Sequence, residues 1–191
     1  MKNDYPIIHF ADTLEFEQWI EQHCTVEKGV WIKIYKKATG TTSISHREAL
    51  DVALCYGWID GQSKGFNQQC YLQKFTPRAP RSMWSSRNRE NVKRLIEQKR
   101  MREGGHAEIE RAKLDGRWEQ AYLPPTEATI PPDLQQAIEK EPQHVQEFFK
   151  TLNRSNIYAI YFRLATAKKP ETRIRRFNAI LQMLKEGKTF H

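Results

Sequence analysis

The chain has 191 residues, of which 39% are hydrophobic, enough to bury the core of one larger or two small domains. Its mean hydropathy of -0.76 indicates a very polar surface, and no apolar run approaches the roughly 18 residues that a membrane span requires. The net charge is +8, and residues 74–117 supply most of it with 13 basic against 6 acidic side chains. Such a field attracts phosphate groups, nucleic acid or acidic protein surfaces.

The N-terminal twenty residues hold one lysine, early acidic residues and no continuous apolar segment, so a signal peptide is not expected. The cysteines at 24, 55 and 70 form no CxxC pair, and Cys55 falls in an apolar helical pattern that predicts a core position. An odd number of cysteines without an export signal predicts reduced thiols and a cytoplasmic protein. The six histidines show no metal-binding spacing, so neither a metal nor another cofactor is expected.

Two helices are predicted in the first sixty residues. Thr13 is placed to cap a helix whose apolar spacing continues to Ile20. Ser45, followed three residues later by Glu48, has the pattern of a capping box, and the helix it begins runs to the residue before Gly57.

Three strands are predicted around the second helix. Residues 30–35 alternate between apolar and polar side chains, which is typical of a half-buried strand. Residues 58–60 and 70–75 form two further β-rich segments separated by a glycine-containing loop. The first half of the chain is therefore predicted to be a small antiparallel sheet with helices.

Beyond residue 80 the pattern becomes helical. A long helix is predicted to start at Ser85 or Ser86 and to break at Gly104 and Gly105, with a second helix over residues 106–115. Four prolines between residues 124 and 132 exclude a helix there, so residues 119–132 are expected to be an extended, exposed linker.

The last third of the chain is predicted to be an all-helical bundle. Residues 133–191 contain several helical segments, and in the last of them Ile174 lies on the apolar face that includes Leu184. The fold class is therefore α+β, with an α+β domain over residues 1–118, the linker, and the helical bundle over residues 133–191. The oligomeric state is left open by the sequence.

Several stretches of the chain resemble one known family. They are LCYGWIDG at 54–61, KFTPRAPRSMWSSRN at 74–88, the residues Met101, Gly104 and Gly105, the segment Gly116-Arg117-Trp118, and AKKPETRIRR at 167–176. In these stretches the chain resembles the YdeI/OmpD-associated family, also called the bacteriocin-protection proteins. Asn67 departs from the pattern, because relatives tend to carry an aspartate after the small loop.

The resemblance implies a soluble bacterial protein linked by name to protection against bacteriocins or cationic antimicrobial peptides. It implies no settled reaction. The role of the protein is therefore expected to be that of a stress-protection or accessory protein, and its binding chemistry has to come from the residues themselves.

The residues at 57–88 predict a binding site for an anion. Two arginines and several neutral donors precede a helix start, where free backbone N–H groups favour negative charge, and two tryptophans could offer stacking faces. The predicted ligand-binding residues are Trp58, Asp60, Arg78, Arg81, Ser82, Trp84, Ser85 and Asn88. The expected partner is an anionic small molecule or an acidic protein surface.

Three alternatives remain open. Both tryptophans could be core residues, with Asp60 bound to the loop or to Arg78. The basic segment 74–117 could bind nucleic acid. The pocket at Trp58, Asp60, Arg78 and Trp84 could belong to an enzyme of unrecognised type, although no catalytic residue can be named, since no paired carboxylates or nucleophile–base motif accompany it.

A second basic cluster lies near the end of the chain, at Lys168, Lys169, Arg173 and Arg176. In one interpretation these side chains form another anion-binding or partner-binding surface. In the other, Arg173 or Arg176 braces the helices by donating to carbonyls at the end of the preceding helix, around residues 165–168, where the C-terminal dipole attracts cations.

Overall fold

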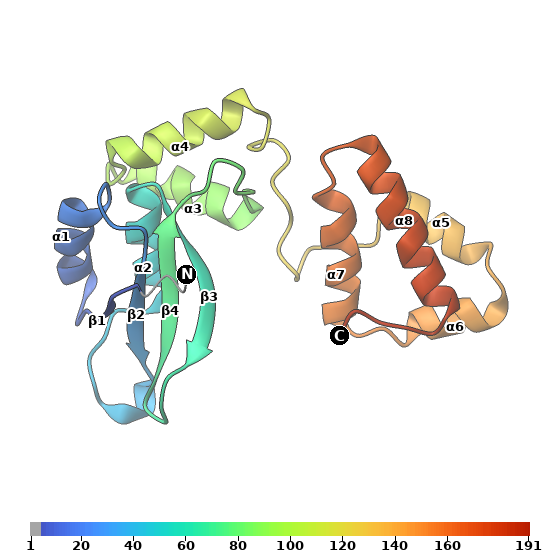
Figure 1. Cartoon of the computed structure of the whole chain (residues 1–191), viewed down its shortest axis with the longest axis horizontal. Coiled ribbons are helices and arrows are strands. Elements are labelled where there is room, and N and C mark those ends of the chain that lie inside the picture. Colours follow the sequence, from blue (N-terminus) through green and yellow to red (C-terminus); the bar gives the residue numbers. More distant parts are fainter. Residues whose placement is uncertain (1–4) are drawn as a thin grey trace. The chain divides into compact units, whose positions relative to one another are not determined.

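The computed structural model describes residues 5–191, and the chain divides into two compact units. The first unit comprises Met1–Ser82 and Asn88–Trp118. The second comprises Met83–Arg87 and Glu119–His191. Figure 1 shows a sheet with helices in the first unit and helices alone in the orange and red part of the second.

A four-stranded sheet organises the first unit, in the order β1-β2-β4-β3. Its strands are β1 (Ile7–His9), β2 (Val30–Tyr35), β3 (Trp58–Gly65) and β4 (Cys70–Pro77). The strands β2, β4 and β3 pair antiparallel, as the sequence predicts, but β1 pairs with β2 in parallel. The sheet is therefore mixed rather than antiparallel, and β1 escaped prediction because three residues are too few to show a strand period.

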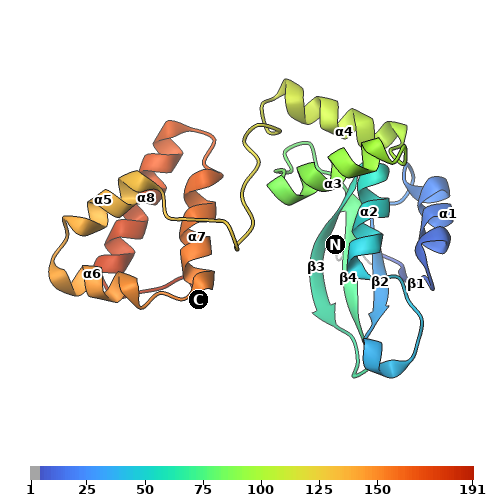
Figure 2. The same ribbon diagram turned by 180° about the vertical axis from the view of Figure 1, so that it is seen from behind.

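The helices of the first unit gather on one side of this sheet. They are α1 (Thr13–His23), α2 (His46–Cys55), α3 (Ser86–Glu97) and α4 (Glu103–Leu114), with a short 3-10 turn at Lys37–Thr39. Figures 1 and 2 together show α2 lying along one face of the sheet, with no helix of the described first unit over the opposite face. The side chains of Val30, Ile32 and Ile34 alternate into the core between β2 and the helices.

Capping residues fix where the first two helices begin. Ser45 and Glu48 form the predicted capping box, and the hydrogen bonds of Glu48 with Ser45 lower its pKa. At α1 the prediction was wrong by one residue: Asp12 is the N-cap, its Oδ1 accepting from the backbone N–H of Glu15 at 3.0 Å, and Thr13 is the first helical residue. A carboxylate caps at least as well as a hydroxyl at this position.

The two adjacent glycines lie inside a helix, which corrects the predicted break at Gly104 and Gly105. The break lies between α3 and α4, where Lys99 has a φ of 58°. A Cβ at Gly105 would lie 2.4 Å from the carbonyl oxygen of Cys55, and one at Gly104 would lie 2.8 Å from that of Tyr56. The glycines therefore allow the first turn of α4 to pack directly against the end of α2.

The second unit is built from α5 (Pro132–Glu139), α6 (Gln143–Lys150), α7 (Arg154–Ala165) and α8 (Pro170–Lys185). Its core consists of the buried side chains Leu134, Ile138, Val145, Ile160, Leu164, Ile180 and Leu184. The predicted apolar face of α8 is correct at Ile180 and Leu184, whereas Ile174 is 59% exposed because it precedes the turns of α8 that pack on the core.

Residues 119–132 are not an exposed linker throughout. Ala128 is only 1% exposed, and its backbone N–H donates to the carbonyl of Pro124 in a turn. Ile130 packs against the core of the second unit. The prolines exclude a helix before α5, as predicted, but the segment buries apolar side chains that hold it on the second unit.

The three cysteines should differ sharply in reactivity. Cys55 and Cys70 are buried, whereas Cys24 is partly exposed, and burial raises the pKa of the Cys55 thiol to about 11. Because the thiolate is the reactive form, a thiol reagent at pH 8 should modify Cys24 first and Cys55 only after denaturation. Peptide mass spectrometry of partly labelled protein checks this order, and equal rates at Cys24 and Cys55 would contradict it.

Within residues 5–191, no helix is both long enough and apolar enough to span a membrane.

Candidate functional site

A cavity of the first unit forms where the ends of five elements meet: α1, α2, β3, β4 and α4. Gly57, with a φ of 78°, turns the chain from α2 into β3, and its carbonyl accepts from the backbone N–H of Arg78 at 3.0 Å. The backbone N–H of Arg102 donates to the carbonyl of Cys55 at 3.0 Å. These two bonds hold the end of β4 and the start of α4 against the same corner of the unit.

The cavity has a volume of about 590 Å³, within the range that small-molecule sites occupy. Its walls consist of Cys24, Thr25, Tyr56, Gly57, Trp58, Pro77, Arg78, Arg102, Glu103, Gly104, Ala107 and Glu108. Two of the predicted ligand-binding residues, Trp58 and Arg78, are among them.

Two aromatic side chains stand behind the cavity wall. Trp58 is 1% exposed, its indole N–H donates to the carbonyl of Cys24 at 3.3 Å, and its ring meets that of Trp19 edge to face. Tyr56 is also buried, which raises the pKa of its phenol, and its hydroxyl makes no hydrogen bond of normal geometry within the described chain. The Arg102 side chain acts on this hydroxyl and lowers its pKa against the effect of burial, so a ligand at this wall would meet the phenol and the guanidinium group together.

The start of α4 supplies the positive side of the cavity. Arg102 is the N-cap of this twelve-residue helix, and no side chain caps the first turn. The Arg102 guanidinium carbon lies 6.0 Å from the centre of the Tyr56 ring, and the side chain is half exposed with Glu17 3.6 Å away. A helix start beside a half-exposed guanidinium group favours an anion.

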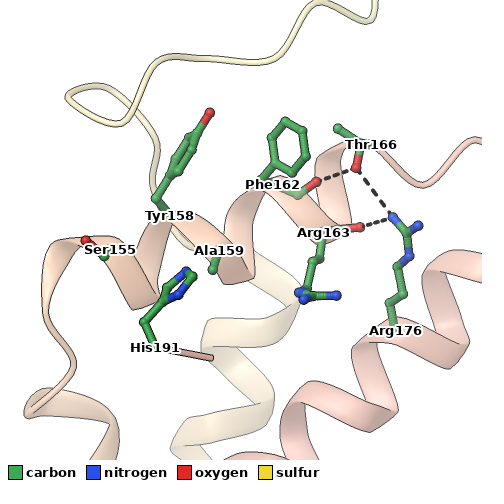
Figure 3. Close-up of a pocket in the computed structure, with 8 residues that line it drawn as sticks. All are labelled: Ser155, Tyr158, Ala159, Phe162, Arg163, Thr166, Arg176 and His191. Atoms are coloured by element: carbon green, nitrogen blue, oxygen red, sulfur yellow. Dashed lines mark hydrogen bonds between the residues drawn. The ribbon is translucent and has the colours of Figure 1, made fainter. Parts of the chain in front are cut away.

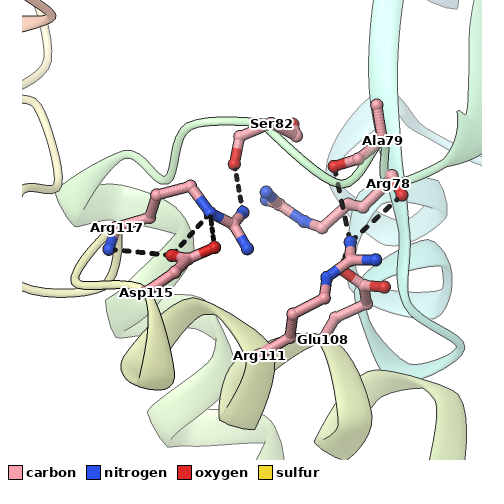
Figure 4. Close-up of polar contacts among 7 residues, drawn as sticks. All are labelled: Arg78, Ala79, Ser82, Glu108, Arg111, Asp115 and Arg117. Carbon is pink, nitrogen blue, oxygen red and sulfur yellow. Dashed lines mark hydrogen bonds and ion pairs between the residues drawn. The ribbon is translucent and has the colours of Figure 1, made fainter. Parts of the chain in front are cut away.

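Behind the cavity lies a cluster of three arginines, which Figure 4 shows. Arg117 is 1% exposed; its Nε donates to both carboxylate oxygens of Asp115 at 2.7 Å, and its Nη1 donates to the carbonyl of Ser82 at 2.6 Å. Arg111 is bound to Glu108, and its Nη2 also lies 3.4 Å from the carbonyl of Arg78. In Figure 4 the side chain of Arg78 extends toward Arg117.

The cluster carries more positive than negative charge. Three guanidinium groups, at Arg78, Arg111 and Arg117, face the two carboxylates of Glu108 and Asp115. The Nη2 atom of Arg117 is buried and has no hydrogen-bond partner in the described chain. Excess positive charge in a partly buried cluster raises the local affinity for an anion.

Asp60 does not take part in this site. Its Oδ2 accepts from Nε2 of His46 at 3.1 Å, so its partner is the first residue of α2 rather than Arg78. The register of β3 explains the difference, because Asp60 lies opposite Phe75, on the strand face that α2 covers.

The remaining predicted residues are divided between the two units. Ser82 offers its carbonyl to Arg117, and Arg81 is exposed on the same loop. Trp84 and Ser85 belong to the second unit, where the backbone of Trp84 accepts from Tyr122 and Ser85 bridges to Tyr122.

The predicted helix start is not free to bind an anion through its first amide. The helix is α3, and the N–H of its first residue, Ser86, donates to the carbonyl of Tyr122 at 2.9 Å. Asn88 is buried within the same helix. The helix start that borders the cavity described above is that of α4 instead.

The C-terminal basic cluster makes specific contacts within the second unit. Arg176 Nη1 donates to the carbonyl of Arg163 at 2.7 Å, in the last turn of α7 and two residues before the predicted range 165–168. Arg173 pairs with Asp133 at 2.7 Å and lowers the pKa of that carboxyl, mainly through their hydrogen bond. Lys168 and Lys169 are exposed in the turn before α8.

Tyr56, Arg102, Glu108, Arg111 and Arg117 were missed as site residues. The sequence feature that could have located them is the two adjacent glycines, Gly104 and Gly105. Adjacent glycines indicate that one backbone segment approaches another closely.

The fold and cavity define a protein with a mixed-sheet unit that holds a small-molecule-sized pocket, joined to a helical unit. The chain belongs to the family described as Domain of unknown function (DUF8412), whose model matches residues 8–108. Residues 127–187 match the model described as Bacteriocin-protection, YdeI or OmpD-Associated, which confirms the resemblance predicted from the sequence. The stretch 167–176 lies in this second match, and the stretches 54–61 and 74–88 lie in the first.

No curated protein and no solved structure matches the chain. In the part of the chain that the structure describes, no group of three or more His, Cys, Asp or Glu side chains is arranged to hold a metal ion.

Proposed function

We propose that this is a bacterial protein of the bacteriocin-protection type that acts by binding a small anionic molecule in the cavity of its first unit. The match of residues 127–187 supports the protection role. The observation that carries the binding role is the cavity of about 590 Å³ with Arg78, Arg102 and the first turn of α4 in its wall.

The geometry suggests how each group would serve. The anion lies at the start of α4, where Arg102 and the first backbone N–H groups donate to it. Arg78, held by the arginine cluster, adds positive charge from behind, and the hydroxyl of Tyr56 donates to the ligand. Trp58, 1% exposed, backs the apolar part of the wall.

Thermal unfolding in inorganic phosphate tests the binding site. At ten times the dissociation constant, phosphate should raise the melting temperature of the parent by about 3 °C relative to chloride at equal ionic strength. The variant Arg102→Gln should lose most of this shift, and Arg102→Lys should keep part of it, because a charge remains.

A matched control removes an equal charge elsewhere on the unit. Arg47 is exposed in the first turn of α2 and does not line the cavity, so Arg47→Gln should keep the full phosphate response. A response that is the same in Arg102→Gln and Arg47→Gln would refute the proposed site.

The protection role has a separate test in cells. Expression of the parent in a bacteriocin-sensitive bacterial strain should raise survival at a fixed dose of bacteriocin, and Arg102→Gln should give less protection at equal protein level. Equal survival with and without the parent would exclude the role, whatever phosphate does in solution.

A second candidate function, binding of single-stranded nucleic acid, rests on the sheet face without helices. There the Nζ of Lys64 lies 4.2 Å and that of Lys74 5.7 Å from the ring centre of Trp31, and Lys33 lies over Phe66. Aromatic rings with lysines on an open sheet suit stacked bases and phosphates.

This face is a better nucleic-acid candidate than the basic segment as a whole. Five cations of residues 74–117 are held in ion pairs with carboxylates of the first unit, at Arg94, Arg102, Arg111, Lys113 and Arg117. A labelled oligothymidine should bind with strong salt dependence and lose affinity in Lys33→Gln, whereas an unchanged affinity would exclude the face.

A further inference from the structure

A second cavity, in the helical unit, lies along one face of α7 (Figure 3). Its volume is about 410 Å³. Ser155, Ala159 and Thr166 fall on the same helical face because they are spaced by four and seven residues, and their small side chains form its floor. All the lining residues belong to the second unit, so this cavity is separate from the one proposed above.

One wall of this cavity is aromatic. Tyr158 and Phe162 project from the same side of α7 in Figure 3, and their ring centres are 5.9 Å apart. Phe162 also meets Tyr122 edge to face, with 4.9 Å between ring centres. These contacts hold the two rings in place, so a flat apolar ligand would meet a preformed surface.

The other wall is cationic. Arg176 is fixed by its Nη1, which donates to the carbonyl of Arg163 at 2.7 Å and lies 3.4 Å from Oγ1 of Thr166. The guanidinium group of Arg163 lies over the ring of Phe190, 4.2 Å from its centre. Neither arginine forms an ion pair with a carboxylate in the described part of the chain, so both keep N–H groups for an anion.

A helical brace alone would not require this arrangement. Arg176 uses one nitrogen for the brace, whereas Arg163, the residue after Phe162, adds a second positive charge to the cavity lining. Because both arginines line the cavity without a carboxylate partner among the described residues, an anion bound there would accept from both guanidinium groups. His191 lines the same cavity.

We propose that this cavity binds a planar aromatic anion of the aryl carboxylate class. The rings of Tyr158 and Phe162 contact the aromatic body of the ligand, and Arg163 with Arg176 binds its carboxylate. The small floor at Ala159 leaves room for the ring system.

Calorimetric titration with 2-naphthoate tests the proposal in the full chain. The parent should bind one molecule per chain, and 2-naphthalenemethanol, a neutral analogue with the same rings, should bind at least about tenfold more weakly, since it lacks the charge-assisted hydrogen bonds. Inorganic phosphate should displace 2-naphthoate only at concentrations at least about tenfold higher, because it can bind the arginines but cannot use the aromatic wall. Displacement by an equal concentration of phosphate, or equal affinity for the neutral analogue, would overturn the proposed ligand class.

Two variants localise the binding, and both leave the brace of Arg176 intact. Arg163→Gln keeps the backbone carbonyl that Arg176 uses and should weaken 2-naphthoate about tenfold, and Ala159→Leu should block it by filling the floor. Arg154→Gln removes an exposed charge from the first turn of α7 and should bind like the parent. The absence of saturable binding to the parent, or parent-like binding by Arg163→Gln and Ala159→Leu, would refute the site.

Binding of 2-naphthoate should not depend on the first cavity. Arg102→Gln, which is expected to lose its phosphate response, should bind 2-naphthoate like the parent. If Arg102→Gln abolishes 2-naphthoate binding, the aromatic anion occupies the first unit and the assignment to α7 is wrong.

Discussion

Replacing Gly105 by alanine should lower the free energy of unfolding of the first unit by about 3 kcal/mol. This is the upper end of the range for adding one methyl group to a packed interior. The new Cβ would lie 2.4 Å from the carbonyl oxygen of Cys55 and 2.8 Å from that of Leu54. Backbone carbonyls at the end of a helix cannot move as a side chain can, so the start of α4 must shift away from α2. Urea unfolding followed by circular dichroism measures the loss.

The loss of stability should be specific to position 105 and should not follow from replacing any glycine. Gly65 has no atom within 4 Å of a built Cβ and needs no positive φ, so Gly65→Ala should leave stability unchanged within about 0.5 kcal/mol or raise it slightly. Because the start of α4 also forms a wall of the first cavity, Gly105→Ala should weaken the phosphate response as well. A Gly105→Ala protein as stable as Gly65→Ala would show that α4 does not pack on α2 as described.

Removing the guanidinium group of Arg117 should also lower the stability of the first unit. Arg117→Met keeps most of the side-chain volume but leaves the carbonyl of Ser82 without its donor and removes the hydrogen bonds from Nε to both carboxylate oxygens of Asp115. We expect a loss of about 2 kcal/mol in the free energy of unfolding, because Arg117 is buried, although Asp115 can turn to water. Arg117→Lys should recover little, since an ammonium group cannot reproduce the fork.

A nearby ion pair gives the comparison. Lys113 pairs with Glu110 at 2.7 Å on the same helix, α4, but both side chains are about half exposed or more. Lys113→Met should therefore change stability by no more than about 0.5 kcal/mol. Equal losses for Arg117→Met and Lys113→Met would mean that the arginine cluster is as solvated as an ordinary surface pair.

Local signals in the sequence predicted much of the fold. The capping box of Ser45 and Glu48, the alternation of β2 and the antiparallel pairing of β3 with β4 all depend on neighbours in the chain or on one short loop, and all three appear in the structure. Those signals need no knowledge of the tertiary fold.

Features that depend on distant packing were not predictable in the same way. Gly104 and Gly105 read as a helix break, because the sequence alone does not show that the carbonyls of Cys55 and Tyr56 lie against them. The same limit applies to Asp60, whose partner follows from the strand face that α2 covers.

The candidate site contains residues that local sequence predicted and residues that only distant packing brings together. Trp58 and Arg78 were predicted from residue type within one stretch and both line the cavity. Tyr56 and Arg102 come from the ends of other elements, and only the packing of α2 against α4 brings them to the same wall. Residue type indicated a binding region, and the tertiary packing selects which of its residues face the cavity.

The most direct test of the proposed anion site is a titration of isotope-labelled protein with phosphate, followed by nuclear magnetic resonance. We predict that the backbone amides of Glu103 and Gly104 and the indole N–H of Trp58 shift together and saturate with one dissociation constant, because all three residues line the cavity. In Arg102→Gln these shifts should be largely lost. If the three resonances stay in place while others move, or if nothing saturates, the first cavity is not an anion site.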